Sequence, residues 1–314
     1  MDRKPVSVKS YANIAIVKYW GKADAERMIP STSSISLTLE NMYTETKLSF
    51  LPEDATGDVM YIDDELQGEK ETIKASKVLD LFRTNPNQHV KIETWNNMPT
   101  AAGLSSSSSG LSALVKAANE LFQVGKTQSE LAQIAKFASG SSSRSFFGPL
   151  AAWDKDSGDV YQVETDLKLA MIMLVLTDQK KPVSSRDGMK LCTETSTSFP
   201  DWIKQSEQDY KDMLGYLKAN DFQAVGELTE ANALRMHQTT STANPPFSYL
   251  TDASYQAMDK VKALRASGEQ CYFTMDAGPN VKVLCLEEDL DRLADHFRKD
   301  YQVIVSRTKE LPDA

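Results

Sequence analysis

The stretch Pro99-Thr-Ala-Ala-Gly-Leu-Ser-Ser-Ser-Ser-Ser-Gly110 combines a flexible backbone with a run of hydroxyls. Residues 90–95 before it alternate as in a strand, and apolar residues after it recur at helical spacing. A serine-rich helix N-terminus offers free amides and the positive end of the helix dipole, so it attracts a phosphate. No Gly-Lys-Ser/Thr triplet follows, so a lysine for the outer phosphates must come from elsewhere. A flexible serine-rich linker is the alternative interpretation.

The composition limits the possible partners. The chain of 314 residues is long enough for two lobes or one large domain with a cleft. Its 35 basic and 44 acidic residues give a net charge of −9, which argues against a nucleic acid or an anionic membrane as partner. Its three cysteines are far apart and lack metal-ligand spacing, as in a cytoplasmic protein with reduced thiols. No apolar run could span a bilayer, and the N-terminus lacks a signal-peptide core.

The N-terminal segment 6–17 is rich in strand formers and leads into Lys18-Tyr19-Trp20-Gly21-Lys22. These lysines are either surface charges at the end of a strand, the usual place for lysine, or part of a site in which Tyr19 and Lys22 reach an anionic substrate. Residues 30–39 and 46–50 alternate well enough for paired strands, and we expect only edge and hairpin material from 52 to 68.

A second serine cluster follows the helix after the serine-rich stretch. Thr127-Gln-Ser-Glu130 forms a capping box before another helix, which ends at Ser139-Gly-Ser-Ser-Ser-Arg144. Arg144 is the only charge in this cluster, and its planar fork suits a carboxylate or a phosphate. The alternative is a loop whose arginine is solvated.

The C-terminal half begins after a predicted buried strand at 167–177. Lys181, Ser185 and Arg186 group potential anion-binding side chains at its end, and Pro182 marks a boundary between residues 1–182 and 183–314. Residues 202–265 are mostly helical, with an interruption at 244–246. The three histidines are scattered, so neither a histidine-based triad nor a histidine metal site is supported.

Asp276 lies where two apolar strands, 270–275 and 281–286, are broken by Asp-Ala-Gly-Pro-Asn. A carboxylate at the end of an apolar strand has the position that a general base needs. Asp276 as a turn former is the alternative. The chain closes with a charged helix near 289–299 and a strand at 303–305. Strands and helices occur in both halves without regular βαβ alternation, which predicts an α+β fold.

Over essentially its whole length, the chain resembles the bacterial-type mevalonate diphosphate decarboxylases of the GHMP kinase superfamily. Residues 99–107 match the superfamily's Pro-x-x-x-Gly-Leu-x-Ser-Ser phosphate loop, with Ser105 where kinases usually have glycine and decarboxylases often alanine. Segments 19–22, 139–144, 185–189 and 276–280 match the decarboxylase signature. The kinases carry a Gly-Ala-Gly segment where this chain reads Met-Asp-Ala-Gly-Pro, and this difference favours a decarboxylase.

The resemblance implies a GHMP kinase-like fold, with an N-terminal lobe like ribosomal protein S5 domain 2 and a ferredoxin-like C-terminal lobe around a deep cleft. It implies that Asp276 sits by the substrate's 3-hydroxyl, that Arg144 holds the substrate's carboxylate, and that Lys181 reaches the ATP phosphates. The implied substrate-binding residues are Tyr19, Lys22, Ser139, Gly140, Ser141, Arg144, Ser185, Arg186 and Met189. The implied ATP-binding residues are Pro99, Ala102, Gly103, Leu104, Ser105, Ser106, Ser107, Ser108 and Lys181.

By the same resemblance Ser107 ligates Mg²⁺, with Ser106 and Ser108 as alternatives, and the protein is a cytoplasmic homodimer. The implied reaction converts mevalonate 5-diphosphate and ATP into isopentenyl diphosphate, ADP, phosphate and CO₂ through 3-phosphorylation, a step of isoprenoid biosynthesis by the mevalonate pathway. Two other functions stay open: a GHMP kinase that stops at the phosphoester, and a non-catalytic nucleotide-binding protein.

Overall fold

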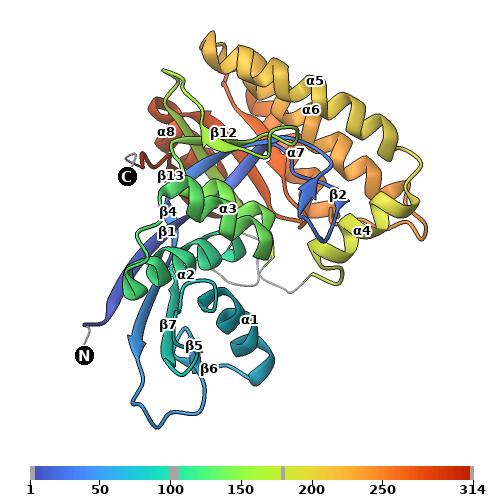
Figure 1. Ribbon diagram of the computed structural model, residues 1–314. Helices are drawn as coiled ribbons and strands as arrows, with labels where there is room; N and C mark the ends of the chain where they lie inside the picture. The colour runs from blue at the N-terminus through green and yellow to red at the C-terminus, as the bar shows by residue number, and fades with distance from the viewer. Residues whose placement is uncertain (1–3, 99–105, 178–180, 312–314) are drawn as a thin grey trace.

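The computed structural model describes residues 4–98, 106–177 and 181–311 (Figure 1). Residues 99–105 of the serine-rich stretch lie outside these ranges, and the side chain of Ser106 is not described. Strands and helices alternate irregularly along the chain, and most of the strands belong to two main sheets. The predicted α+β class is confirmed.

The N-terminal lobe is built on a seven-stranded sheet. Its order is β6-β5-β7-β4-β8-β9, and β1 also pairs with β4. The strands are β1 (Val6–Val17), β4 (Ser34–Phe50), β5 (Val59–Ile62), β6 (Glu65–Leu66), β7 (Val90–Asn96), β8 (Leu150–Trp153) and β9 (Val160–Gln162). Helices α1 (Glu69–Leu79), α2 (Ser106–Phe122) and α3 (Gln128–Ala138) share an apolar core with β7, from which water is excluded. A 3₁₀ helix, η1 (Gly140–Phe146), follows α3.

Several local predictions are confirmed, and some are wrong. Helix α2 follows the serine-rich stretch, and both bonds of the Thr127–Glu130 capping box precede α3. The segments 30–39 and 46–50 do not pair with each other, because most of the first and all of the second belong to the single 17-residue strand β4. No turn separates them, and β1 pairs along nearly the whole of β4. The region after Gly68 forms helix α1, which the expectation of edge and hairpin material did not include.

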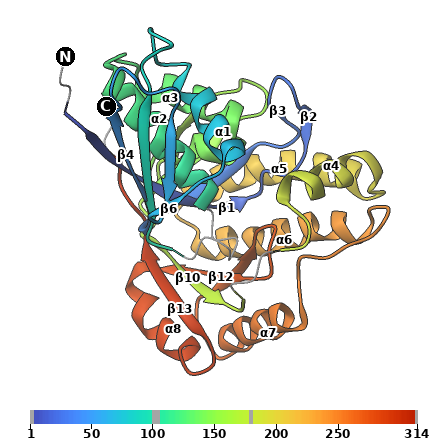
Figure 2. The same cartoon turned by 90° about the horizontal axis from the view of Figure 1, so that it is seen from below.

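The C-terminal lobe contains a four-stranded sheet of order β11-β12-β10-β13. These strands are β11 (Tyr272–Met275), β12 (Val281–Leu286), β10 (Leu169–Val175) and β13 (Gln302–Arg307). Helices α7 (Asp252–Ala266) and α8 (Leu290–Phe297) pack on one face (Figure 2). The other face shares a core with β1, α5 (Phe199–Lys218) and α6 (Phe222–Ser241). Short elements complete the fold: β2 (Lys22–Asp24), β3 (Ile29–Pro30), α4 (Ser185–Thr195) and η2 (Glu287–Asp289).

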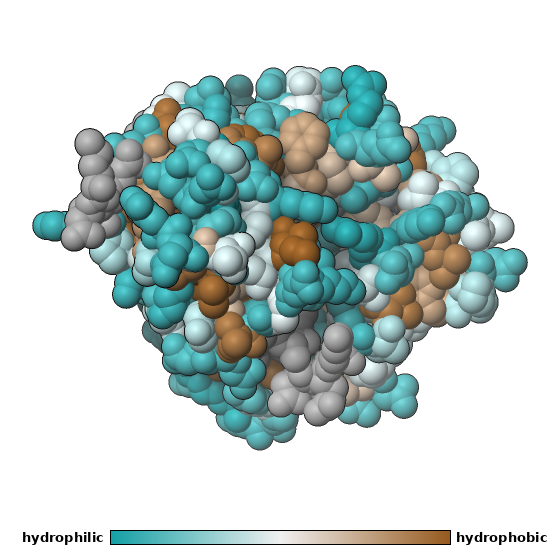
Figure 3. All heavy atoms as spheres, turned by 60° about the horizontal axis from the view of Figure 1, so that its bottom comes forward, coloured by the Kyte–Doolittle hydropathy of each residue, from teal (hydrophilic) through white to brown (hydrophobic). Residues whose placement is uncertain are grey.

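The end of β1 contacts the C-terminal lobe. The backbone amide of Lys18 donates to Oδ1 of Asn232 on α6 at 2.8 Å, which joins this end of β1 to the C-terminal lobe. The face in Figure 3 is mostly hydrophilic, with apolar side chains in small groups. Within the described residues, no helix is both long and apolar enough to cross a membrane.

Candidate active site

A partly buried carboxylate lies between two lysines where the lobes meet. Asp276, in the turn after β11, contacts Lys18 Nζ through Oδ1 at 2.8 Å and Lys282 Nζ through Oδ2 at 3.0 Å. The two lysine side chains are 2% and 1% exposed, whereas the Asp276 side chain is 25% exposed. The cluster therefore offers one partly accessible carboxylate that is held at both oxygens.

Burial and charge set the ionisation of this cluster. Burial alone would favour the neutral acid, but Lys18 and Lys282 hold the pKa of Asp276 well below its usual range. Burial lowers the pKa of Lys18 to about 8, although its contact with Asp276 acts in the opposite direction. A carboxylate of such low pKa is a weak proton acceptor in the resting protein, but it remains a good hydrogen-bond acceptor.

Arg144 is also buried, so the interpretation of its segment as a solvated loop is wrong. Its side chain comes from η1, where Nη1 donates to Ser34 Oγ at 2.7 Å and Nε donates to Ser36 Oγ at 3.0 Å. Among the described residues, no carboxylate oxygen lies within 4.0 Å of its guanidinium. Burial lowers its pKa to about 10, so Arg144 stays cationic at neutral pH. A buried guanidinium without an acidic partner is suited to an anionic ligand.

The segment before Arg144 is held by Asn13 and by Tyr19. Asn13 Nδ2 on β1 donates to Ser141 O at 2.9 Å and to Ser145 Oγ at 2.8 Å. A Cβ at Gly140 would lie 2.9 Å from the Tyr19 ring and 2.8 Å from Trp153, so only glycine fits there without a shift. The Ser139 and Ser141 hydroxyls lie 3.2 Å apart. These contacts bring the predicted residues 139–141 beside Tyr19.

Tyr19 and Lys22 follow β1 on the same side of the site. The Tyr19 ring lies 5.1 Å from the Trp153 ring, and burial raises the pKa of Tyr19 to about 12, so its hydroxyl stays protonated. Lys22 Nζ lies 3.3 Å from Met28 Sδ. Burial, and then the charge of Arg186, lower the pKa of Lys22.

The predicted residues near α4 adjoin the turn that contains Asp276. Lys181 Nζ donates to Ser185 Oγ at 2.7 Å and to Ala277 O at 2.6 Å, so it bridges α4 and the Asp276 turn. Burial lowers the pKa of Lys181, and nearby Asp276 opposes that shift. Arg186 is exposed, whereas Met189 packs in a core with Trp20 and Trp202.

The start of α2 is only partly described. Pro99, Ala102, Gly103, Leu104 and Ser105 lie outside the described residues, as does the Ser106 side chain. Ser107 is exposed, Ser108 is buried, and the first turn of α2 carries no acidic residue. Ser109 Oγ bonds to Thr44 Oγ1 at 2.7 Å, so the far end of the serine run contributes to the core. No cluster of three or more histidine, cysteine or acidic side chains suitable for a metal occurs in the described ranges.

Sequence reasoning missed Lys282 and Asn13, and it named Lys18 only as one of several charges at a strand end. Lys18 is buried, so its interpretation as a surface charge is wrong. The signal for Lys282 was a lysine inside an apolar strand, Val281-Lys-Val-Leu-Cys-Leu286, because a charge in a buried strand needs a partner. The three cysteines are free and buried.

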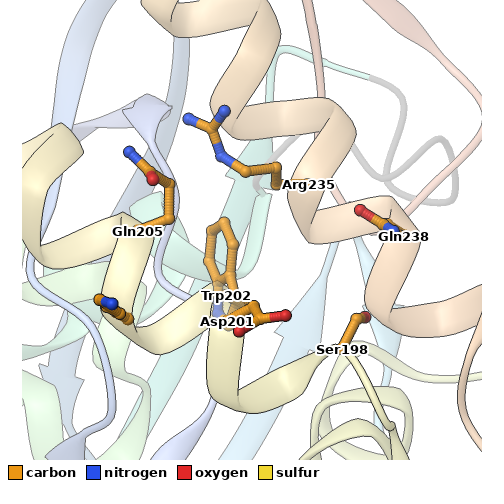
Figure 4. Close-up of a pocket in the computed structure, with 7 residues that line it drawn as sticks. Ser198, Asp201, Trp202, Gln205, Arg235 and Gln238 are labelled. Carbon is orange, nitrogen blue, oxygen red and sulfur yellow. The ribbon is translucent and has the colours of Figure 1, made fainter.

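A separate pocket of about 350 Å³ lies between α5 and α6 (Figure 4). It is lined by Ser198, Asp201, Trp202, Lys204, Gln205, Arg235 and Gln238. None of the predicted site residues lines it. Trp202 Nε1 donates to Trp20 O at 2.9 Å, and Arg235 pairs with the buried Asp209. These contacts stabilise the junction of α5, α6 and the end of β1.

Comparison with known proteins identifies the family. Residues 10–163 match a model of the diphosphomevalonate decarboxylase-like N-terminal domain, and residues 171–312 match the mevalonate 5-diphosphate decarboxylase C-terminal domain. The diphosphomevalonate decarboxylase of Candida albicans is 30% identical over 94% of this chain and 88% of its own length.

Solved structures agree with this assignment. The mevalonate pyrophosphate decarboxylase of Streptococcus pyogenes is 66% identical, with a TM-score of 0.97 over 100% of this chain and 99% of that one. A relative solved in complex with MVAPP, AMPPCP and magnesium is 40% identical, with a TM-score of 0.89 over 98% of each chain. The chain belongs to the mevalonate diphosphate decarboxylase family.

Proposed function

We propose that the protein converts mevalonate 5-diphosphate and ATP into isopentenyl diphosphate, ADP, phosphate and CO₂. The observation that carries this proposal is the buried Arg144, held by two serine hydroxyls and without an acidic partner among the described residues, in the electrostatic field of Asp276. A substrate with a carboxylate and a hydroxyl on neighbouring carbons matches this pair of groups. Arg144 binds the carboxylate and Asp276 accepts a hydrogen bond from the 3-hydroxyl.

The main role of Asp276 is to orient the substrate's 3-hydroxyl, and not to remove its proton before phosphoryl transfer begins. The hydroxyl oxygen forms a bond to the outer phosphorus of ATP, the bond from that phosphorus to ADP breaks, and the hydroxyl proton passes to Asp276 late in the transfer. Phosphoryl transfer passes through a loose transition state, so positioning and charge stabilisation matter more than a strong base. This role agrees with a carboxylate whose pKa two lysines depress.

Decarboxylation follows because phosphate is a better leaving group than hydroxide. The C3–O bond breaks as phosphate departs, the bond to the carboxylate carbon breaks, and its electron pair forms the new double bond as CO₂ leaves. The cations Lys18 and Arg144 stabilise the charge on the departing phosphate. Tyr19, Lys22, Ser139, Gly140, Ser141, Ser185, Arg186 and Met189 surround the substrate and its diphosphate.

The start of α2 fits a nucleotide phosphate with Mg²⁺. Its first turn carries no acidic residue, so no negative charge of that turn opposes an anion there. ATP is held by Pro99, Ala102, Gly103, Leu104, Ser105, Ser106, Ser107, Ser108 and Lys181. Ser107, whose side chain is exposed, is the metal-ligating serine, with Ser106 and Ser108 as alternatives. Bound Mg²⁺ neutralises the phosphate charge that develops during transfer.

A product assay tests the reaction. Purified protein with mevalonate 5-diphosphate, ATP and Mg²⁺ is expected to release ADP, inorganic phosphate and CO₂ in equal amounts, with isopentenyl diphosphate as the organic product. ADP without CO₂, together with a stable phosphorylated acid, would show a kinase instead. Nucleotide binding without ADP release would show a non-catalytic protein.

We also propose a homodimer in the cytoplasm, with the lobes divided before β10 and not after Pro182 as expected, because β10 pairs with β12 and β13 in the C-terminal sheet. The family resemblance supports the dimer, and three free, buried cysteines are consistent with a reducing compartment. Sedimentation over a concentration series tests the dimer: a single species of 34.9 kDa throughout would contradict it.

A further inference from the structure

We propose that Lys282 is a positioning residue for the reaction: it holds Oδ2 of Asp276 while Lys18 holds Oδ1, so that the carboxylate is locked in one orientation. This inference rests on the proposed role of Asp276. The two contacts measure 3.0 and 2.8 Å and come from different lobes, because Lys282 lies on β12 and Lys18 follows β1. The orientation of Asp276 therefore depends on how the lobes meet.

The position of Lys282 on β12 is otherwise apolar. Val281 and Val283 face the core under α7 and α8, whereas Leu284 packs in the core shared with β1. Alternation along a strand places Lys282 on the same face as Leu284, and its partner in the sheet on β10 is Met173, a residue of that core. An apolar side chain would suit this position, so the lysine is not explained by packing.

Lys282 is also not needed to balance charge. Lys18 alone neutralises Asp276, and the second lysine gives the buried cluster an excess positive charge. A buried cation costs free energy unless its partner compensates it, and here two cations share one carboxylate. The geometry instead places one ammonium group at each oxygen of Asp276: Lys18 donates a hydrogen bond to Oδ1, and Lys282 forms an ion pair with Oδ2.

Other charged groups also face Asp276. Lys18 follows β1, Lys282 lies on β12, Arg144 lies on η1, and Lys181 precedes α4. His237 on α6 also lies in this field, and burial lowers its pKa to about 4, so it is neutral at working pH. The charges of Lys282 and Arg144 add to the effect of burial in lowering the pKa of Lys18. Removal of Lys282 must therefore raise the pKa of Lys18.

The test compares Lys282→Met, Asp276→Asn and the double variant with the unchanged enzyme. For each, kcat, KM, thermal stability and the pH profile of kcat/KM are measured with mevalonate 5-diphosphate, ATP and Mg²⁺. Lys282→Gln is the second variant, because an amide can still donate to Asp276 but carries no charge. Lys260→Met is the matched control: Lys260 on α7 pairs with Asp300 behind the opposite face of the same sheet.

We expect Lys282→Met to fold and to lose between about 10- and 100-fold in kcat, the effect of a misplaced reacting group, while the Lys260→Met control keeps normal kcat. The alkaline limb of the kcat/KM profile of Lys282→Met is expected to move upward by about half a pH unit or more, since this variant lacks a positive charge next to Lys18. Lys282→Gln is expected to keep more of kcat than the methionine variant and to show the same upward shift. Added to Asp276→Asn, Lys282→Met should cause little further loss, because it acts through Asp276.

Three results would overturn the inference. In the first, Lys282→Met has a normal kcat and an unmoved alkaline limb, while Asp276→Asn is inactive. The proposed function would then stand, but Lys282 would have no part in it. Fully additive losses in the double variant would show that Lys282 does not act through Asp276. If Lys282→Met fails to fold, an unshifted alkaline limb in the kcat/KM profile of Lys282→Gln would show that the role of Lys282 is purely structural. Normal activity of Asp276→Asn would instead contradict the proposed function itself.

Discussion

Two carboxylates in this protein are paired with buried cations in opposite ways. Asp58, in the N-terminal lobe, accepts hydrogen bonds from Arg83 Nη2 and Ser76 Oγ, both at 2.6 Å, and from the amide of Val90 at 2.8 Å. Its side chain and that of Arg83 are 3% and 5% exposed. One carboxylate meets one guanidinium, and both oxygens are bonded within the protein.

Asp276 differs because its surroundings carry an excess of positive charge. It meets two ammonium groups, and Arg144 and Lys181 add further positive charge nearby. The Asp58 pair joins α1 to the start of β7 and is complete without a ligand. The Asp276 cluster is balanced only when an anion enters, so the comparison separates a structural ion pair from a binding site.

The largest effect is expected from Asp276→Asn. An asparagine fits the space and a turn, but its amide is uncharged and leaves two buried lysines without a partner. We expect kcat to fall on the order of 10³-fold, while nucleotide affinity is kept. If Asp276 only formed the turn, its replacement would be benign, and steady-state activity with a nucleotide titration distinguishes these outcomes.

Arg144→Lys should have the next largest effect. The charge is kept, but an ammonium cannot reproduce a two-pronged contact with a carboxylate or bond to both Ser34 and Ser36. We expect kcat/KM to fall on the order of 10²-fold. Near-normal kcat/KM in a folded variant would remove Arg144 from the site.

Asp58→Asn tests the other half of the comparison. Loss of this charge leaves buried Arg83 without its main partner and should lower the free energy of unfolding by about 3 kcal/mol. Because this pair is structural, kcat should stay unchanged. Chemical denaturation and steady-state kinetics check both parts, and a loss of activity in the still-folded variant would weaken the distinction.

The smallest effect is expected from pH. Lys18 must be protonated to pair with Asp276, and burial lowers its pKa to about 8, so kcat/KM should fall by about tenfold per pH unit above this value. The stability of the fold, in contrast, is expected to rise with pH as Lys18 loses its charge. Its folded-state pKa lies below 10.5, so its buried charge destabilises the fold below pH 8 and this cost disappears as the pH rises. Activity should therefore decline without unfolding, which circular dichroism at each pH can verify.

Most of the local structure was predictable from the sequence. The local signals were the strand formers in 6–17, the alternation in 90–95, the capping box at Thr127 and the helical spacing after Gly110. All of them report backbone preferences that neighbouring residues decide. Those elements are present as β1, β7, α3 and α2. Family-specific motifs pointed to the decarboxylase reaction and to Arg144 and Asp276 before any contact was known.

Only the tertiary structure showed how these residues meet. Sequence reasoning split β4 into two segments, because which neighbour a strand pairs with depends on residues far away in the chain. It interpreted Lys18 as one of several strand-end charges and passed over Lys282, which lies more than 250 residues further along the chain. Burial and charge pairing are properties of the assembled lobes: Lys18 and Lys282 acquire their function only where β1 and β12 bring both ammonium groups to one carboxylate.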